Sequence, residues 1–334
     1  MSQGALVGGC SGANQARISV RAIQPSGASS LRTPGARCFT VRSPAFAAAM
    51  ELYDMEPGLK AIASVGSVLN CQELTGVQAG MNLLKSKEKY PEIYFWGKIL
   101  GLSGDYYIAY GLGSSEFEFP SKAFFFAGGD FDFQPLKALT KDVAAKVAGL
   151  AAEGPFTGVP TAVLPGQGPV GEEEQGEAEE GEEPAAAGPP KLTEADRLAQ
   201  VVPEIDHDTA VVPRGAHALN EAHAVVPSSD FTGLGGTEAT ALSKYVHFRP
   251  PVSVASLRAL ARTDAQFYAN FLDPLEGDLP MGCWAVRQDP SAMLVTLRSL
   301  SWPGYAAFHV PGTKKFGGAY FGYGQKCRDL PFML

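Results

Sequence analysis

Phe95-Trp96-Gly97-Lys98-Ile99-Leu100-Gly101-Leu102-Ser103-Gly104-Asp105-Tyr106-Tyr107-Ile108-Ala109-Tyr110-Gly111-Leu112 is the stretch that decides the fold. Two runs of aromatic and branched residues flank a Leu-Ser-Gly break, a pattern typical of two antiparallel strands joined by a turn. Because side chains alternate along a strand, one face of the first run holds Ile93, Phe95 and Ile99 and the other holds Tyr94, Trp96, Lys98 and Leu100. Neither face is simply polar, so we expect helices or a second protein to cover the hairpin on both sides.

The bulk composition limits the class of protein. At 334 residues the chain is long enough for one large domain or two, and its hydrophobic share of 45% is ordinary for a globular protein. The net charge of −8 argues against a general binder of nucleic acid or anionic membranes. No apolar run approaches the roughly 20 residues that a membrane span needs. We therefore expect neither nucleic acid nor membrane as a partner.

The residues that usually carry chemistry form no recognisable site. The cysteines are odd in number and lack a Cys-x-x-Cys motif, so we expect reduced thiols in a cytosolic compartment; they are Cys10, Cys38, Cys71, Cys283 and Cys327. Only two histidines are close in sequence, at a spacing of six that fits no zinc motif, so we interpret all five as surface or hydrogen-bonded core residues; they are His207, His217, His223, His247 and His309.

Motifs for nucleophiles and nucleotides are also missing. The sequence has no Gly-x-Ser-x-Gly elbow, and neither glycine cluster, at 111–113 or 318–324, precedes an amphipathic helix that would bind a phosphate. Asp105 beside two tyrosines is more typical of a turn aspartate than of an acid–base group. We predict no catalytic residue, no cofactor and no metal site.

Two segments differ from the rest in composition. Residues 1–49 hold five arginines and no Asp, Glu or Lys, which fits an organelle transit peptide or a start codon assigned too early, with the product beginning at Met50. We favour the second interpretation, because no amphipathic periodicity is present. Residues 154–191 form a Gly/Pro-rich insertion in which eight of the twelve residues Glu172–Glu183 are Glu, and we expect disorder there. The predicted folded domain therefore has two parts, residues 50–153 and 192–334.

The first part begins with a predicted pair of helices within 51–89. Apolar residues recur at the spacing of one helix face, first as Leu59, Ile62, Ala63, Gly66 and Leu69, then as Leu74, Val77, Met81 and Leu84. Asn70 and Glu73 resemble a capping box at the start of the second helix. Tyr90-Pro91 ends it, because the residue before proline favours extended geometry.

The remaining pattern indicates an α+β fold, in which the N-terminal helical pair is followed by a mainly antiparallel sheet with short helices. Further strands are predicted at 122–126, 209–215, 283–288, 293–300, 305–310 and 318–323, and the last four, joined by tight turns, indicate an antiparallel meander. Helical segments are predicted at 135–151, 193–200, 237–245, 256–261 and 265–272. The core candidates after the hairpin are Phe124, Phe125, Phe126 and Phe131.

Several short motifs in one order resemble the radial spoke head protein 9 family. They are Phe95-Trp96-Gly97-Lys98-Ile99-Leu100-Gly101, Asp105-Tyr106-Tyr107-Ile108-Ala109, Pro213-Arg214-Gly215-Ala216, Tyr245-x-His247-Phe248-Arg249, Arg298-Ser299-Leu300-x-Trp302-Pro303-Gly304 and Asp329-Leu330-Pro331-Phe332-Met333-Leu334. They run from about Met50 to the last residue. Radial spoke head proteins 4 and 6 share the Trp-Gly-Lys-Ile and Trp-Pro-Gly patterns, but the ending Leu-Pro-Phe-Met-Leu and the chain length favour protein 9.

The resemblance implies a non-catalytic structural subunit of the radial spoke head in the axoneme of motile cilia and flagella. It implies a hetero-oligomer with radial spoke head protein 4/6-type subunits and other spoke head components. The residues expected to form an interface or a structural signature are Tyr94, Trp96, Lys98, Tyr106, Tyr107, Trp302, Pro303 and Gly304. The arginine-rich leader has no family counterpart, and the Glu-rich insertion is longer than the family needs. The leader alone supports the alternative, an enzyme imported into an organelle.

Overall fold

The computed structural model describes residues 48–66, 68–113, 118–150, 154–165, 191–262, 264, 270–289, 291 and 293–333. Predictions for residues 1–47 of the leader predicted at 1–49, for the Glu-rich run and for residues 265–269 of the helical segment 265–272 lie outside the described residues. Ala48 and Ala49, the last two residues of the predicted leader, are buried in the core and belong to the folded domain, which the prediction began at Met50. Among the described helices, none is both long and apolar enough to cross a membrane.

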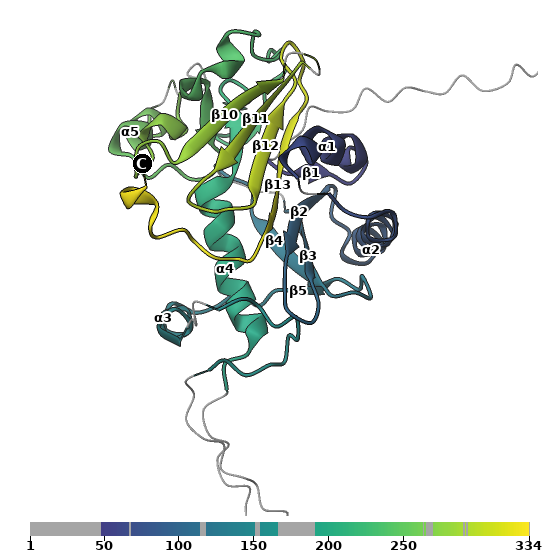
Figure 1. Cartoon of the computed structure of the whole chain (residues 1–334). Coiled ribbons are helices and arrows are strands. Elements are labelled where there is room, and N and C mark those ends of the chain that lie inside the picture. Colours follow the sequence, from purple (N-terminus) through teal and green to yellow (C-terminus); the bar gives the residue numbers. More distant parts are fainter. Residues whose placement is uncertain are drawn as a thin grey trace, which may run out of the picture. The chain divides into compact units, whose positions relative to one another are not determined.

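A sheet of nine strands forms the centre of the described fold (Figure 1). Its order is β10-β11-β12-β13-β2-β3-β4-β5, with β1 paired to β2 as well. The strands are β1 (Met50–Glu51), β2 (Ile93–Ile99), β3 (Tyr106–Leu112), β4 (Lys122–Ala127), β5 (Gln134–Pro135), β10 (Trp284–Asp289), β11 (Leu294–Ser299), β12 (Tyr305–His309) and β13 (Phe316–Gly322). The pair β13–β2 is parallel, whereas the other pairs are antiparallel.

The helices and the smaller elements lie around this sheet. The helices are α1 (Met55–Ile62), α2 (Cys71–Glu88), α3 (Lys141–Leu150), α4 (Glu194–Thr209) and α5 (Val254–Leu260). Two small antiparallel sheets pair β6 (Val211–Pro213) with β9 (Tyr245–His247) and β7 (His217–Leu219) with β8 (Val225–Pro227). The 3-10 turns are η1 (Ala63–Val65), η2 (Glu238–Thr240), η3 (Leu242–Lys244), η5 (Leu275–Gly277) and η6 (Leu330–Phe332). The predicted α+β class, with a helical pair before a mainly antiparallel sheet, is confirmed.

The central hairpin β2–β3 is covered on both faces by the protein's own chain. On one face, α1 and α2 contribute the fully buried Ile62, Val77 and Met81 to a core that includes Phe95 (Figure 1). On the other face, α4 lies against a second core that includes Trp96. Apolar burial on both faces explains why neither side of the first strand is polar in sequence. The expected two-sided cover is confirmed.

A β-bulge corrects the predicted faces of β2. The register with β3 shifts between Phe95 and Gly97, so the bulge inserts one extra residue and the alternation reverses after it. Ile99 consequently joins the core of Trp96, although simple alternation placed it with Phe95. Lys98 moves the other way, to the side of α2. The error arose because a glycine within a strand does not itself reveal whether the pairing continues without a bulge.

The start of α2 follows the predicted capping box. The Glu73 backbone N–H donates to Asn70 Oδ1 at 2.8 Å, and the Asn70 backbone N–H donates to Glu73 Oε2 at 2.9 Å. At the other end, Lys89 adopts a left-handed conformation and its N–H caps the Lys85 carbonyl. The side chains of Asn70 and Glu73 thus accept from two backbone N–H groups that have no partner within the helix. Both residues could be identified from their spacing in the sequence.

Two helix predictions need correction in length. The segment predicted at 135–151 is helical only in α3, since Pro135 belongs to the edge strand β5. The helix predicted at 193–200 continues as α4 to Thr209, past Pro203, because burial of Leu198, Val202 and Ile205 against the sheet outweighs the hydrogen bond that the proline removes.

Two other segments also differ from the prediction. The helix predicted at 237–245 consists of the turns η2 and η3 followed by the start of β9. The disorder predicted for residues 154–191 is wrong for residues 154–165, which are ordered around Phe156, whose side chain is fully buried. Residues 166–190 of that prediction lie outside the described residues. A single aromatic in a Gly/Pro-rich context is a weak sequence signal, which explains this error. The predicted strands of the C-terminal meander are confirmed as β10 to β13.

Candidate functional site

A polar cluster fastens α2 to the central hairpin. The Lys98 ammonium of β2 lies 2.8 Å from Glu73 Oε1 and 2.8 Å from Asp105 Oδ2. The Tyr107 hydroxyl of β3 donates to the same Glu73 oxygen at 2.9 Å. Glu73 therefore caps its own helix with one carboxylate oxygen and binds the hairpin with the other. This arrangement fixes where α2 begins on the sheet.

The ionisation of the Lys98 cluster is set by its internal partners. Burial alone would raise the pKa of Glu73, but hydrogen bonds from Lys98, Asn70 and Tyr107 outweigh it and lower that pKa. Burial would likewise lower the pKa of Lys98, yet the hydrogen bonds to Asp105 and Glu73 raise it above its ordinary value. Burial and the Glu73 carboxylate raise the pKa of Tyr107 to about 12. Lys98 and Glu73 therefore each favour the charged form of the other.

A second cluster surrounds Glu194, the first residue of α4. Its carboxylate accepts from the Tyr106 hydroxyl at 2.7 Å and from the backbone N–H groups of Thr157 and Gly158 at 2.7 and 2.9 Å. Burial would raise the pKa of Glu194, but these donors lower it. The side chain thus joins β3, the 154–165 segment and the helix.

The same region closes the base of the insertion. The Leu164 N–H donates to the Leu192 carbonyl at 3.1 Å, and the Glu194 N–H donates to the Ala162 carbonyl at 2.8 Å. The two flanks of residues 166–190 therefore lie side by side. An insertion that leaves and returns at one point lengthens the chain without interrupting the sheet.

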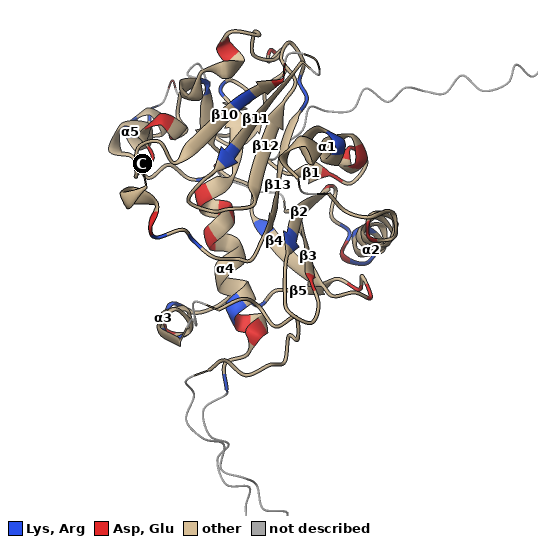
Figure 2. Cartoon of the chain, in the orientation of Figure 1, with Lys and Arg blue, Asp and Glu red and all other residues tan. Residues whose placement is uncertain are grey.

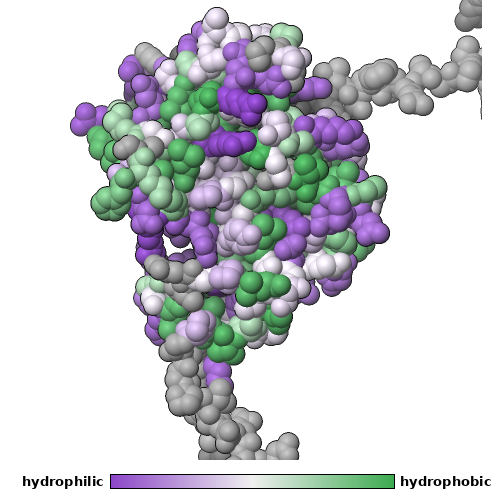
Figure 3. Space-filling model, viewed as in Figure 1, coloured by the Kyte–Doolittle hydropathy of each residue, from purple (hydrophilic) through white to green (hydrophobic). Residues whose placement is uncertain are grey.

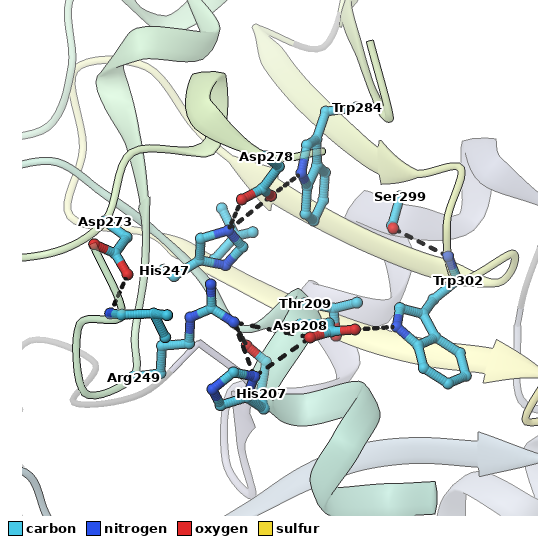
Figure 4. A network of polar contacts seen from close by, with 12 residues as sticks. His207, Asp208, Thr209, His247, Arg249, Asp273, Asp278, Trp284, Ser299 and Trp302 are labelled. Carbon is cyan, nitrogen blue, oxygen red and sulfur yellow. Dashed lines mark hydrogen bonds and ion pairs between the residues drawn. The ribbon is translucent and has the colours of Figure 1, made fainter. Parts of the chain in front are cut away.

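A third network lies at the C-terminal end of α4 (Figure 4). Asp208 accepts from the indole N–H of Trp302 at 2.9 Å and from the Lys326 ammonium at 2.8 Å. The Arg249 guanidinium donates to the His207 carbonyl at 2.9 Å. Burial would raise the pKa of Asp208, but the hydrogen bonds from Lys326 and Trp302 lower it.

A neighbouring group of contacts is built on a second aspartate (Figure 4). Asp278 accepts from the indole N–H of Trp284 at 2.7 Å and lies 2.8 Å from Nε2 of His247, which is fully buried. Asp273 accepts from the Val252 N–H at 2.7 Å. The His-Phe-Arg and Trp-Pro-Gly motifs, far apart in sequence, thus meet at one end of α4.

Most of the predicted site residues are buried, and they do not form a single site. Buried side chains among them are Tyr94, Trp96, Lys98, Tyr106, Tyr107 and Trp302. Pro303 is exposed, and Gly304 has φ +109° in a turn where a Cβ would meet the Phe321 carbonyl oxygen at 2.2 Å. The structure brings Lys98 and Tyr107 together, but it leaves Trp302 in a different network.

Sequence reasoning missed the acidic partners of these residues. Glu73 had a local signal but only as a helix cap, and Glu194 had none beyond its place near a helix start. Asp208 is 94 positions from Trp302 and 118 from Lys326, so no local pattern connects them. His309 does fit the prediction of a hydrogen-bonded core histidine, because Nε2 accepts from the Leu234 N–H at 3.2 Å and burial lowers its pKa.

Two open grooves lie beside α4, and residues of this helix line part of each. One, of about 680 Å³, is lined by residues that include Phe124, Leu136 and Pro203, and the other, of about 280 Å³, includes Phe119 and Phe248. Within the part of the chain that the structure describes, no group of three or more His, Cys, Asp or Glu side chains is arranged to hold a metal ion. The described cysteines Cys71, Cys283 and Cys327 are free thiols.

Comparison with known proteins identifies the family. The family model described as radial spokehead-like protein matches residues 46–213. A radial spoke head protein 9 homolog of Danio rerio is 35% identical over 285 residues, which cover 85% of this chain and 100% of that protein. The chain belongs to the radial spokehead-like protein family. Homologs of the same name from Homo sapiens and Bos taurus are 34% and 33% identical, and each alignment covers 80% of this chain and 94% of the relative.

Family membership confirms the resemblance that the sequence motifs indicated. The matched range 46–213 contains both the Lys98 cluster and the Glu194 cluster. It also contains Asp208, but the Trp302 that binds this aspartate lies beyond it.

Proposed function

We propose that this radial spoke protein is a non-catalytic structural subunit of the radial spoke head in motile cilia and flagella. It supports assembly of the axoneme and regulation of ciliary beating through contacts with other proteins. Its partners are radial spoke head protein 4/6-type subunits and other head components, in a hetero-oligomer. The observation that carries the proposal is the match to radial spoke head protein 9 homologs over nearly their whole length.

The chemistry of the buried clusters supports a structural role. An acid–base group acts best when its pKa lies near the working pH. Glu73, Glu194 and Asp208 instead have lowered pKa values, because internal donors hold each carboxylate in its charged form. Their charges fasten helices to the sheet. We further propose that residues 50–153 and 192–334 are two parts of one folded domain, since the parallel pair β13–β2 joins strands from both.

The test is recovery of the full chain with its proposed partners. A tagged copy expressed in ciliated cells should sediment with isolated axonemes and should be recovered in extracted spoke heads together with a protein 4/6-type subunit. An axonemal protein outside the radial spokes, carrying the same tag, is the control for nonspecific carry-over into the spoke head preparation. A chain found only as a soluble monomer, or in another organelle, would contradict the proposal.

A further inference from the structure

The strand β10 forms a long edge of the central sheet. It pairs with β11 through six consecutive residue pairs, without a bulge, and lies at one end of the strand order (Figure 1). The opposite end is β5, which has two residues, one of them Pro135. Proline and short length are common ways to prevent further pairing at an edge. β10 has neither protection.

The backbone of β10 presents unused hydrogen-bonding groups. Cys283, just before the strand, accepts from the Leu300 N–H at 2.8 Å and so points toward β11. Because backbone direction alternates, Ala285 and Arg287 also point toward β11. The residues whose N–H and C=O groups point away are Trp284, Val286 and Gln288. Within the described part of the chain, these outward groups make no hydrogen bond, and the neighbouring turn η2 makes none to β10.

The face beside this edge carries two arginines and, at the end of β10, Asp289. Arg287 is exposed on β10, and Arg298 is half-buried on β11, opposite the small Ala285. Opposite residues of an antiparallel pair share a face, so both guanidinium groups lie on one side of the sheet. Neither makes an ion pair with any residue that the structure describes. Figure 2 shows the basic residues on β10 and β11, and Figure 3 shows hydrophilic side chains over the same strands.

Exposed apolar residues lie in the segment that leads into β10. Leu279 is 84% exposed and Met281 is 69% exposed. Single exposed apolar residues are normal, but here two of them precede an edge strand with free outward backbone groups and two arginines without an ion-pair partner among the described residues. The combination fits a partner segment with apolar and acidic side chains.

We propose that the β10 edge binds an extended acidic segment of another spoke head protein, which adds to the sheet as a further strand. The inference rests on the proposed function, because it assigns one surface to the assembly role. Main-chain hydrogen bonds to the outward groups would supply affinity, and acidic side chains near Arg287 and Arg298 would supply specificity. A second copy of this chain fits less well, since its own Arg287 would lie near the same guanidinium groups.

Hydrogen–deuterium exchange at residue level tests the pairing directly. In the free full chain, the amides of Trp284, Val286 and Gln288 should exchange rapidly, whereas those of Ala285 and Arg287 should be protected by β11. In isolated spoke heads, the three outward amides should slow by about tenfold or more while the other two stay protected. Outward amides that remain fast in assembled heads would overturn the proposal.

Two variants of the full chain, introduced in place of the endogenous copy, test the chemistry. Val286→Pro removes an outward N–H that β11 does not use, so the free chain should unfold near the wild-type midpoint while its recovery in spoke heads falls about tenfold. Arg287→Glu should lower recovery about three- to tenfold, because acidic partner residues would then face a like charge. Arg258→Glu, an exposed reversal on α5, is the matched control and should leave recovery unchanged.

The remaining outcomes are distinct. If the outward amides of the free chain become protected as its concentration rises, a second copy occupies the edge and the acidic partner is wrong. If Val286→Pro destabilises the free chain, the recovery of Arg287→Glu in spoke heads becomes the deciding measurement. Normal recovery of Arg287→Glu would overturn the charge argument. If wild-type chain never enters spoke heads, the proposed function fails first, and this inference fails with it.

Discussion

Replacement of Gly97 by alanine should unfold the junction between the two parts of the chain. Gly97 lies at the bulge of β2 and pairs with Tyr320 of β13, in the parallel pair that joins β2–β5 to β10–β13. Its φ is +153°, and a Cβ there would lie 2.2 Å from the Tyr320 carbonyl oxygen and 2.7 Å from the Tyr320 nitrogen. Both neighbours are backbone atoms within a central strand, so they have little freedom to move.

The size of this effect follows from two terms. An unfavourable backbone conformation costs about 1–3 kcal/mol, and overpacking in a well-packed core costs about 1–3 kcal/mol more. The sum, about 2–6 kcal/mol, is a large part of the roughly 5–15 kcal/mol that stabilises a typical domain. The assay is urea unfolding of the purified full chain. Gly129→Ala is the control, because nothing lies within 4 Å of a Cβ there. A Gly97→Ala midpoint equal to that of the control would refute the reasoning.

Three further substitutions test other parts of the structure. Trp96→Ala should destabilise folding by about 3–5 kcal/mol, because Trp96 is only 5% exposed and its ring centroid lies 5.3 Å from that of Tyr320. A melting temperature equal to that of the wild type would show that the hairpin is not part of the core. Glu73→Gln should cost about 1–3 kcal/mol at pH 7 in urea unfolding. Trp302→Phe keeps a ring but removes the N–H that Asp208 accepts, so it should cost about 1–3 kcal/mol in the same assay; an unchanged unfolding free energy would mean that this hydrogen bond contributes nothing.

The stability that Glu73 contributes should also depend on pH. The folded-state pKa of Glu73 is lowered from 4.5, so its charge contributes stability above pH 4.5, and that contribution is lost as the pH falls through the lower folded-state pKa. The difference between wild type and Glu73→Gln should therefore shrink on acidification. A difference that is constant from pH 7 to the acid limit of the folded protein would show that the carboxylate charge is not the cause.

The features predictable from sequence were those with local signals. Asn70 and Glu73 are three residues apart, so a capping box could be identified without knowing the fold. Alternating aromatic residues and turn residues likewise identified the hairpin and the four C-terminal strands. Each of these signals depends on residues within one or two turns of one another.

Features that depend on distant contacts could not be predicted. The parallel pairing of β13 with β2 joins residues more than 200 positions apart, and nothing in either strand specifies its neighbour. The bulge at Gly97 reversed the faces of Lys98 and Ile99, because a one-residue shift moves every later side chain to the other face. α4 continued past Pro203 because tertiary burial overrode local propensity.

Two lysines near the final turn of the chain form contacts within the fold. Lys326 binds Asp208, and Lys314 donates to the Ser229 carbonyl at 2.8 Å. Their long-range partners gave no signal in sequence. The signature residues that suggested an interface are mostly buried anchors, so the surfaces that meet partners must be sought elsewhere, with β10 as the first place to examine.

Cross-linking of intact spoke heads tests the central claim most directly. An amine-reactive reagent applied to isolated heads should join exposed lysines of this chain, such as Lys137 and Lys315, to other head subunits, with 4/6-type subunits among them. The account predicts links between this chain and its partners at high yield in heads that contain it. Absence of the chain from purified heads, or links only within the chain itself, would contradict the claim that it is a structural subunit of the radial spoke head.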